Sequence, residues 1–251
     1  PDPDNPDLAY VGSWLGGMLT AQGGEILTVF DENNSSLEVR EEFLLPEGEG
    51  FVGVADIVKD DDNNLWMTNG YADEPLAVLR PDGSWESFSL EGNFDSRDVL
   101  TRMIVSQEGD LWMLDHRGGV VAFSPTREEG SDNPQLFKSG NGNGGLPVDE
   151  VFSIAEDLDG EIWVGTSDGV AVFYSPFDAF SNDPSDARQI LVEQDGIFQF
   201  YSKHRALAPS LLMEQIGSGL EHSAREYFYF QKMEQNKFFD LLQIKVRSFL
   251  M

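Results

Sequence analysis

Short apolar runs alternate with turns rich in Gly, Asp, Asn and Pro, and three segments share one order of apolar and polar positions. The segments are VADIVKDDDNNLWMTN at 54–69, TRMIVSQEGDLWMLD at 101–115 and VFSIAEDLDGEIWVGT at 151–166. Each predicts a strand, an acidic turn and a second strand that carries a tryptophan. These tryptophans, Trp66, Trp112 and Trp163, are 46 and 51 residues apart. That spacing is close to the period of about 40 to 50 residues of four-stranded propeller blades.

Two further apolar runs follow each tryptophan. The third runs are LAVLRPDG at 76–83, GVVAFSP at 119–125 and GVAVFYSP at 169–176. The fourth runs are WESFSL at 85–90, QLFKS at 135–139 and RQILVEQ at 188–194. Four consecutive strands without a helical spacer form an antiparallel meander, and such sheets bury both faces only by stacking on one another. The chain is therefore predicted to be all-β, a partial β-propeller of four-stranded antiparallel blades.

The opening segment predicts the second half of an earlier blade, with strands at 23–32 and 37–45. We therefore expect three whole blades plus part of another, after a flexible, Pro/Asp-rich start at 1–10. The expected blades are approximately 11–48, 51–92, 99–140 and 149–200. Because a closed ring needs about four to eight blades, the chain is expected to be part of a longer propeller. Its first residue is Pro1 instead of Met, which suggests that the original N-terminus was lost by processing or truncation.

Composition excludes several classes of function. The chain has 45 acidic and 16 basic side chains and a formal charge of -29, which argues against nucleic acid because phosphates are bound through Lys and Arg. No apolar run reaches the length of about 18 residues that a membrane-spanning helix needs. The absence of cysteine excludes a disulfide framework, a thiolate nucleophile and Cys-ligated zinc.

The blade pattern stops at Tyr201, and the charge changes there. Residues 1–200 carry 40 acidic and 9 basic side chains, whereas residues 201–251 carry 5 and 7. Over 226–234 a reading frame displaced by one base leaves each codon little freedom. Its successive codons encode Ile/Val, Phe/Leu, Leu, Phe/Leu, Ser/Pro, Lys/Glu, Asn/Asp and Gly, which is the pattern of the third apolar run of a blade. We therefore predict a single lost or gained base near the codon for Phe200, and a non-native helical or disordered tail at 201–251. The alternative is a genuine helical C-terminal segment.

The repeated residues have a structural interpretation. Trp66, Trp112 and Trp163 are expected to be the bulky plates that pack one blade on the next. The turn between the first two strands of the last blade is assigned to Asp157, Asp159 and Gly160, and Gly165 and Thr166 complete the motif after its tryptophan.

A calcium loop is the alternative for the acidic turn of the second blade. Asp60, Asp62 and Asn64 are closely spaced oxygen ligands, which suit that ion. The corresponding turn of the next blade reads SQEGD and has fewer carboxylates. The structural turn is favoured, and neither a metal nor another cofactor is expected.

No pattern for catalysis emerges, so the protein is expected not to be an enzyme. Before Tyr201 the only histidine is His116, which lies in LDHRGG and is best explained as a turn residue. Among 40 acidic residues some pair meets glycosidase spacing by chance. The segment SGNGNGGLP at 139–147 lacks the ending of a phosphate loop and is interpreted as a flexible connection between blades.

One insertion offers a candidate binding element. The segment SPFDAFSNDPSDA at 175–187 carries Phe177 and Phe180 among turn-forming residues. Exposed aromatic side chains on such a loop can dock a partner or a glycan. The alternative is a small apolar cluster beneath the loop.

Two stretches carry a family resemblance. DLDGEIWVGT at 157–166 resembles the blade of two-component regulator propellers. ARQILVEQDG at 187–196, followed by the restored frame, is similar to PorZ-type proteins of the type IX secretion machinery. This resemblance implies a non-enzymatic component of the periplasm, outer membrane or cell surface, whose partners are other outer-membrane secretion proteins and lipopolysaccharide.

Two alternative functions and one physical conflict accompany this resemblance. The alternatives are the periplasmic ligand-sensing propeller of a hybrid histidine kinase and a propeller-fold polysaccharide lyase or hydrolase. The negative charge of residues 1–200 repels an anionic glycolipid, so a contact needs bridging divalent cations or a local basic spot. Arg97, Arg102 and Arg117 are the candidates for such a spot.

Overall fold

A computed structural model describes residues 1–39, 51–90, 99–127, 133–194 and 197–200, of which 191–194 and 197–200 are described by their backbone. The described residues form antiparallel sheets and one short 3-10 helix, which confirms the all-β prediction. The predicted tail at 201–251 and the shift of reading frame near Phe200 concern a segment outside the described residues. In the described part, no helix is long and apolar enough to cross a membrane.

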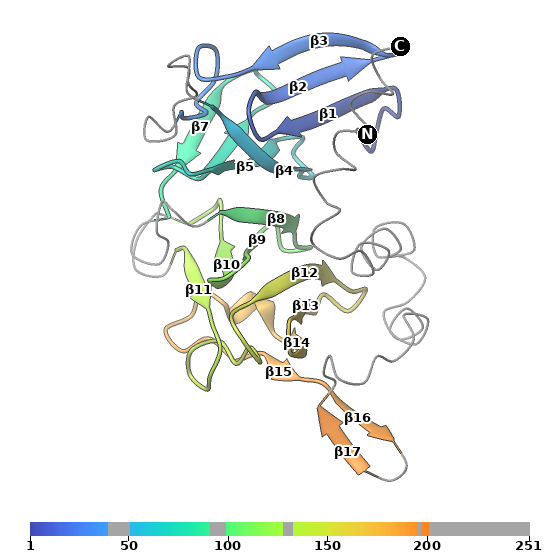
Figure 1. Ribbon diagram of the computed structural model, residues 1–251, viewed down its shortest axis with the longest axis vertical. Coiled ribbons are helices and arrows are strands. Elements are labelled where there is room, and N and C mark those ends of the chain that lie inside the picture. The colour runs from blue at the N-terminus through green and yellow to red at the C-terminus, as the bar shows by residue number, and fades with distance from the viewer. Residues whose placement is uncertain (40–50, 91–98, 128–132, 195–196, 201–251) are drawn as a thin grey trace. The chain divides into compact units, whose positions relative to one another are not determined.

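Consecutive strands are neighbours in every sheet, which is the meander order that the sequence predicts. The first sheet contains β1 (Leu8–Ser13), β2 (Gly17–Gln22) and β3 (Glu25–Phe30). The second contains β4 (Gly53–Lys59), β5 (Leu65–Gly70), β6 (Leu76–Leu79) and β7 (Trp85–Phe88). The third contains β8 (Leu100–Val105), β9 (Leu111–Asp115), β10 (Gly119–Phe123) and β11 (Gln135–Phe137). The fourth contains β12 (Val151–Glu156), β13 (Ile162–Thr166), β14 (Gly169–Phe173) and β15 (Arg188–Gln189), and a hairpin of β16 (Leu191–Gln194) and β17 (Ile197–Phe200) follows. Figure 1 shows these sheets in chain order.

The sheets stack through three apolar clusters, one between each pair of successive four- or three-stranded sheets. Every residue of β5, β9 and β10 is buried. Strands covered on both faces have nearly continuous apolar sequences instead of alternating ones, which explains runs such as GVVAF. Adjacent side chains then belong to different clusters, as Trp66 packs toward the third sheet and Met67 toward the first.

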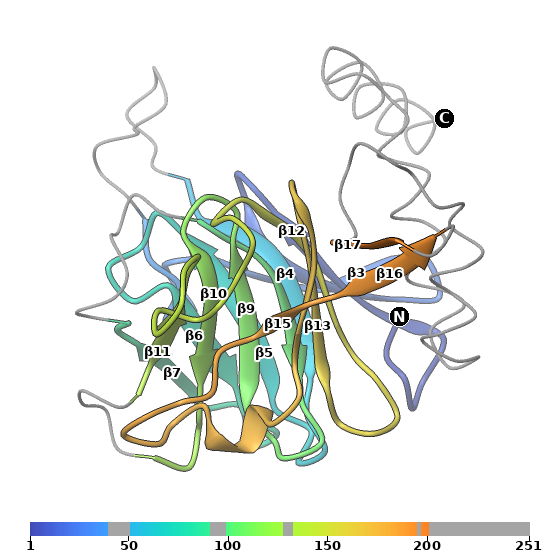
Figure 2. The same ribbon diagram turned by 90° about the horizontal axis from the view of Figure 1, so that it is seen from below.

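The first strands of successive four-stranded sheets lie next to one another along the inner side of the stack of sheets. The fourth strands lie along its outer side. Figure 2 shows β4 and β12 on one side of the view and β7 and β11 on the opposite side, and β8 contacts both β4 and β12. Each inner strand has an irregular register with its neighbour, in β4 between Val54 and Ile57. The same irregularity recurs in β8 and β12. Bulges at equivalent positions bend and twist the three inner strands in the same way.

The first sheet contains the second to fourth strands of a blade. Gly17 and Gly119 have φ values of 70° and 101°, and a Cβ on either would collide with the carbonyl oxygen of a phenylalanine on the following strand. The hairpin pairs Ser13 with Gly17 as the third sheet pairs Asp115 with Gly119. Strand β1 is therefore the counterpart of β9, and β3 is the fourth strand.

One prediction about this region needs correction, and a second is tested only in part. The strand at 23–32 is the fourth of its blade, whereas we predicted it as the third, and two strands precede it. Residues 37–39 are outside any strand, and the remainder of the predicted strand at 37–45 lies outside the described residues. The sequence of β2, GMLTAQ, has few large apolar residues and therefore did not predict a strand. Its sheet has one exposed face, as at Val11, Ile26 and Val29, so fewer apolar residues are needed there.

The predicted fourth strand at 188–194 is divided in the structure. Arg188 and Gln189 pair with β14, while β16 pairs with β17. A fourth strand has only one neighbouring strand to hold it, so its apolar sequence does not determine how far the pairing extends.

Candidate functional site

A hydrogen-bonded lock connects the acidic turn of two blades to the tryptophan of the next strand. The indole N–H of Trp66 donates to Asp60 Oδ2 at 2.8 Å. The indole N–H of Trp163 donates to Asp157 Oδ2 at the same distance. The other carboxylate oxygen of Asp157 accepts the main-chain N–H groups of Asp159 and Glu161, both at 3.0 Å. Gly160 closes this turn with a φ of 81°. The aspartate thus fixes both the turn and the tryptophan ring.

The first blade contains the same lock with a tyrosine in place of tryptophan. The Tyr10 hydroxyl donates to Asp2 Oδ2 at 2.8 Å, and Asp2 Oδ1 accepts the main-chain N–H of Asp4. Lys59 lies 3.0 Å from Asp2 Oδ2 and ties this turn to the second sheet. The Tyr10 hydrogen bond, helped by Lys59, lowers the pKa of Asp2 to about 2. Burial and the nearby Asp2 carboxylate raise the pKa of Tyr10 to about 12.

The expected flexible start at 1–10 therefore differs from the structure. Asp2 is 4% exposed, and β1 begins at Leu8. The sequence DPDNPDLAYVGS does contain the signal, because its spaced aspartates precede an aromatic strand residue. We missed it because Tyr10 replaces the tryptophan and two prolines resemble a linker.

Two of the three tryptophans pack between sheets. Trp66 lies 5.6 Å from Phe88 in its own sheet and 6.4 Å from Phe123 in the third sheet, between ring centroids. Trp112 stacks on Phe137 and lies 5.1 Å from Phe173 of the fourth sheet. Trp163 is half-buried.

Gly165 and Thr166 also have structural contacts. A Cβ on Gly165 would collide with the Ser153 hydroxyl. The Thr166 hydroxyl donates to the Gly169 carbonyl at 3.0 Å and so supports the β13–β14 turn.

Of the three proposed calcium ligands, Asp60 is already occupied by N–H donors. Asp60 accepts four hydrogen bonds, from the main-chain N–H groups of Asp62 and Asn64, the Asn64 side-chain amide and the Trp66 indole. An amide that donates to a carboxylate turns its N–H group toward the position that a cation would need. Within the described ranges, no group of three or more His, Cys, Asp or Glu side chains is arranged to hold a metal ion.

Two further carboxylates connect neighbouring sheets. Asp56 accepts the Met103 main-chain N–H at 2.8 Å, and Glu156 accepts the Gln107 main-chain N–H at 2.9 Å. Burial raises the pKa of both carboxyl groups above their usual values. Arg102 faces Asp56 closely enough to oppose this shift.

The candidate basic spot stays a prediction, because only two of its three arginines are among the described residues. Arg102 is engaged near Asp56, Arg117 is exposed on the β9–β10 turn, and Arg97 lies outside the described residues. His116 also has a structural role, since its Nδ1–H donates to the Val151 carbonyl at 3.1 Å and its ring packs on Phe152.

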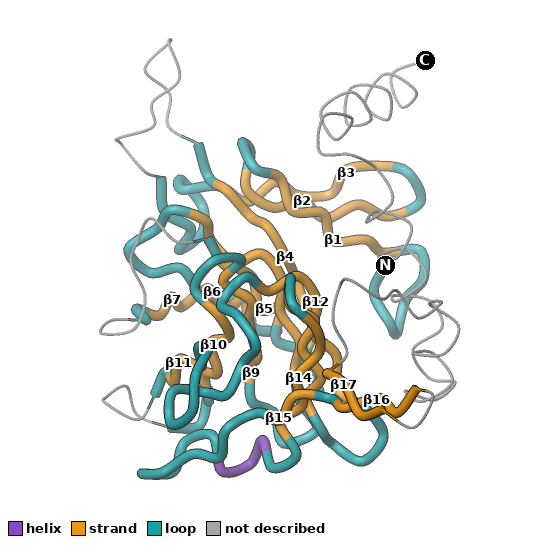
Figure 3. The backbone as a smooth tube through the Cα atoms, turned by 60° about the horizontal axis from the view of Figure 1, so that its bottom comes forward, coloured by secondary structure: helices purple, strands orange, loops and turns teal. Residues whose placement is uncertain are grey.

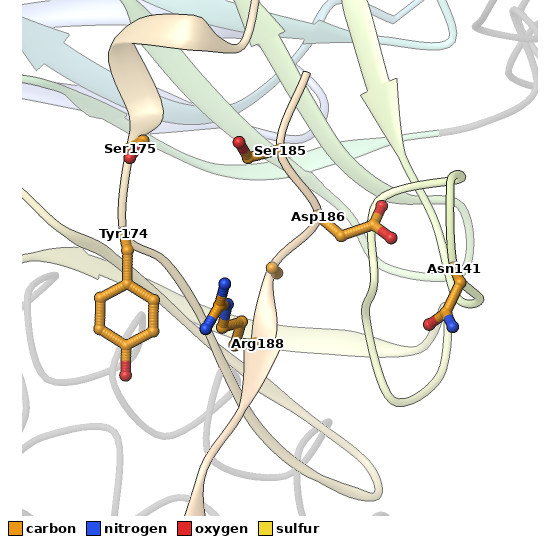
Figure 4. A pocket seen from close by; sticks show the side chains of 7 residues that line it. Asn141, Tyr174, Ser175, Ser185, Asp186 and Arg188 are labelled. Carbon is orange, nitrogen blue, oxygen red and sulfur yellow. The ribbon is translucent and has the colours of Figure 1, made fainter. Parts of the chain in front are cut away.

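An open pocket lies between the Gly-rich loop after β11 and the insertion after β14. Its volume is about 780 Å³. The lining residues are Asn141, Tyr174, Ser175, Ser185, Asp186, Ala187 and Arg188. Figure 4 shows Arg188 between Tyr174 and Asp186 in that view, with Asn141 on the neighbouring loop.

The Gly-rich loop, which we predicted to be a flexible connection, is held by several hydrogen bonds. Asp186 accepts the main-chain N–H groups of Gly142 and Gly144 at 2.6 and 2.9 Å. The Ala187 N–H donates to the Gly144 carbonyl at 2.9 Å. Gly145 has a φ of 70°, and a Cβ there would collide with the Ala187 carbonyl oxygen. Glycine is therefore needed here for close approach of the two loops.

The two phenylalanines of the insertion have different environments. Phe180 is 4% exposed and belongs to the apolar cluster between the third and fourth sheets. Arg127 lies over its ring, 5.1 Å from the centroid. Phe177 is 69% exposed and lies in the 3-10 helix η2 (Pro176–Asp178), which is purple in Figure 3. Only Phe177 of this pair is accessible to a partner.

Comparison with known proteins supports this architecture. Residues 145–168 match the family described as Two component regulator propeller. A search of curated proteins found no match. PorZ, described as an essential surface component of the type-IX secretion system of Porphyromonas gingivalis, is 20% identical with a TM-score of 0.64. The alignment covers 79% of this chain and 28% of PorZ, so the chain spans less than a third of that relative.

Two other solved structures are similar. The extracellular domain of the putative one component system BT4673 from B. thetaiotaomicron is 18% identical, with a TM-score of 0.50, and the match covers 75% of this chain and 21% of that one. A virginiamycin B lyase from Staphylococcus aureus is 14% identical with a TM-score of 0.42, over 57% and 43% of the chains. The chain thus has the fold of part of a β-propeller, similar to PorZ, with a match to the two component regulator propeller family at residues 145–168.

Proposed function

We propose that this chain belongs to a non-enzymatic binding or scaffold propeller of a cell-surface secretion and cargo-attachment machinery of the PorZ type. The observation that carries the proposal is the fold similarity to PorZ over 79% of the chain. The proposed partners are other outer-membrane secretion proteins and lipopolysaccharide, and the proposed location is the periplasm, outer membrane or cell surface.

The arrangement of side chains supports binding over catalysis. Within the described ranges, His116 and the carboxylates Asp2, Asp60 and Asp157 are engaged in hydrogen bonds that hold turns and strands. A catalytic acid or base must instead be presented to a substrate. The open pocket beside Tyr174 is lined by polar side chains but does not contain a pair of acidic side chains that could act as catalytic acid and base.

A gene deletion in the source bacterium tests the secretion role. The expected result is that secreted cargo proteins remain in the periplasm or are released unattached, and that the complete gene restores their surface attachment. Unchanged attachment of cargo in the deletion strain would contradict the proposal. Polysaccharide cleavage by the purified complete protein would contradict its non-enzymatic part.

The second candidate is the ligand-sensing propeller of a hybrid two-component system. The specific observation in its favour is the match of residues 145–168 to the two component regulator propeller family. In that case the deletion would leave cargo attachment intact and would abolish a transcriptional response to the ligand. The same strain therefore separates the two candidates.

A further inference from the structure

We propose that the pocket between the Gly-rich loop and the insertion binds a saccharide that carries a carboxylate, such as a uronic acid unit. Its walls combine an exposed aromatic ring, an arginine and small polar side chains. The inference deepens the proposed binding function by naming a ligand class, and it does not depend on the secretion role.

Tyr174 supplies an apolar platform. Successive side chains of an extended segment point to opposite faces, and Phe173 is buried against Trp112. Tyr174 consequently faces outward and is 48% exposed. An exposed aromatic face can cover the apolar C–H face of a pyranose ring, while the hydroxyl group remains available for hydrogen bonding.

Arg188 supplies the positive charge. The same alternation buries Ala187 and exposes Arg188, which pairs through the backbone with Val172. Among the described residues, its guanidinium has no hydrogen bond or ion pair, whereas Arg80 is paired with Glu86. A planar guanidinium binds a carboxylate through two parallel hydrogen bonds, so this group favours an acidic ligand.

The neighbouring acid leaves Arg188 available. Both oxygens of Asp186 accept main-chain N–H groups, from Gly142 and Gly144. Figure 4 shows the Arg188 side chain directed toward the Tyr174 side of the pocket in that view. A ligand carboxylate can therefore pair with the guanidinium beside the aromatic ring.

Asn141 and Ser185 supply groups for sugar hydroxyls. The Asn141 amide has no intramolecular hydrogen bond in the described part of the chain, and an amide both donates and accepts. The Ser185 hydroxyl donates to Asp178 at 2.8 Å, which leaves its oxygen able to accept. The polar lining favours a hydroxyl-rich ligand over a purely apolar one.

The walls are held in place before any ligand arrives. Asp186 and the Ala187–Gly144 hydrogen bond join the two loops, and Asp178 anchors Ser185. Preformed walls reduce the entropy lost on binding. The volume of about 780 Å³ lies within the usual range of ligand pockets, about 300 to 1,000 Å³, and accommodates a disaccharide.

Isothermal titration calorimetry on the complete chain tests the proposal, with digalacturonate as probe and neutral galactobiose as comparison in metal-free buffer. We expect digalacturonate to bind more tightly than galactobiose. Arg188→Gln should weaken digalacturonate binding about tenfold or more and leave galactobiose unaffected, because only the acid uses the charge. Tyr174→Ala should weaken both sugars because both use the ring.

Arg80→Gln is the control, since it removes the same charge from a partly exposed arginine on the β6–β7 turn, where it pairs with Glu86. It should leave both affinities unchanged. Equal effects of the Arg188 and Arg80 substitutions would overturn the proposal, as would the absence of digalacturonate binding or a preference for galactose 6-phosphate. These results leave the cargo-attachment test unaffected, so failure of one is distinguishable from failure of the other.

Discussion

Removal of the Asp60 carboxylate should destabilise the protein through its tryptophan lock. Asp60 accepts two main-chain N–H groups, one amide N–H and the Trp66 indole N–H. Trp66 is 1% exposed, so water does not readily replace the lost acceptor. Asp60→Ala therefore leaves a buried donor unsatisfied and loosens the turn.

The magnitude follows from these contacts. An unsatisfied buried N–H group costs about 1 to 3 kcal/mol. The N–H groups of Asp62 and Asn64 belong to a more exposed turn and can bond to water, so their loss adds about 1 kcal/mol. We expect Asp60→Ala to lower the free energy of unfolding by about 3 kcal/mol. Asp61→Ala, which removes the same charge from an exposed neighbour, should change it by less than about 0.5 kcal/mol.

Urea unfolding followed by tryptophan fluorescence and circular dichroism measures these differences. A double-mutant cycle with Trp66→Phe isolates the indole–carboxylate hydrogen bond, because phenylalanine keeps much of the apolar ring and loses the donor. We expect a coupling energy of about 1 to 2 kcal/mol. Additive effects of the two substitutions, or equal losses for the alanine variants at 60 and 61, would refute the lock as a stabilising element.

Three further predictions concern other parts of the structure. Burial raises the pKa of Asp56, so the folded state holds this proton more tightly than the unfolded chain. The contribution of Asp56 to stability is present below the unfolded value of about 3.9 and is lost as pH rises through the folded pKa. Asp56→Asn should remove this loss of stability. The unfolding free energy of the variant relative to wild type, measured from about pH 3 to about pH 7, should therefore increase with pH. A difference that stays constant with pH would contradict this prediction. Asp2→Ala should lower the pKa of Tyr10 from about 12 toward the ordinary value of about 10, as measured by ultraviolet titration with Tyr10→Phe to assign the signal; an unchanged titration would argue against the hydrogen bond. Gly142 and Gly145 have φ values of 72° and 70°, but only at 145 would a Cβ collide with another loop. Gly145→Ala should therefore lose about 1 to 3 kcal/mol more than Gly142→Ala in the same unfolding assay, and equal losses would contradict the close approach.

The sheets were predictable because tryptophan and its acidic turn recur with a regular period. β4 to β14 match the predicted runs to within one residue at each end that departs from them. The clearest runs belong to β5, β9 and β10, since strands buried on both faces require continuous apolar sequence. The first blade was harder to recognise. Its lock uses Tyr10, whose hydroxyl reaches Asp2 as the tryptophan indole reaches Asp60. A pattern based on tryptophan alone does not detect a donor of another residue type.

The pocket was not predictable because its walls depend on contacts between distant segments. Asp186 holds Gly142 and Gly144 across more than forty positions of sequence. The glycines suggested flexibility, and they lack side chains that would signal their partner. The sequence did identify the insertion at 175–187, and its phenylalanines were the predicted binding residues. The pocket residues Tyr174 and Arg188 lie directly before and after this segment and carry no comparable sequence signal.

The acidic composition also has a structural explanation that a sequence count does not provide. Asp2, Asp60 and Asp157 hold turns, and Asp56 and Glu156 join sheets, each by accepting N–H groups. Short turns and staggered strands leave main-chain N–H groups that need acceptors, and carboxylates serve this purpose well. Part of the net charge of -29 is therefore a property of the blade architecture and does not indicate a cationic ligand. Against this background an unpaired arginine beside an exposed aromatic ring is more informative about the ligand than the large number of acids.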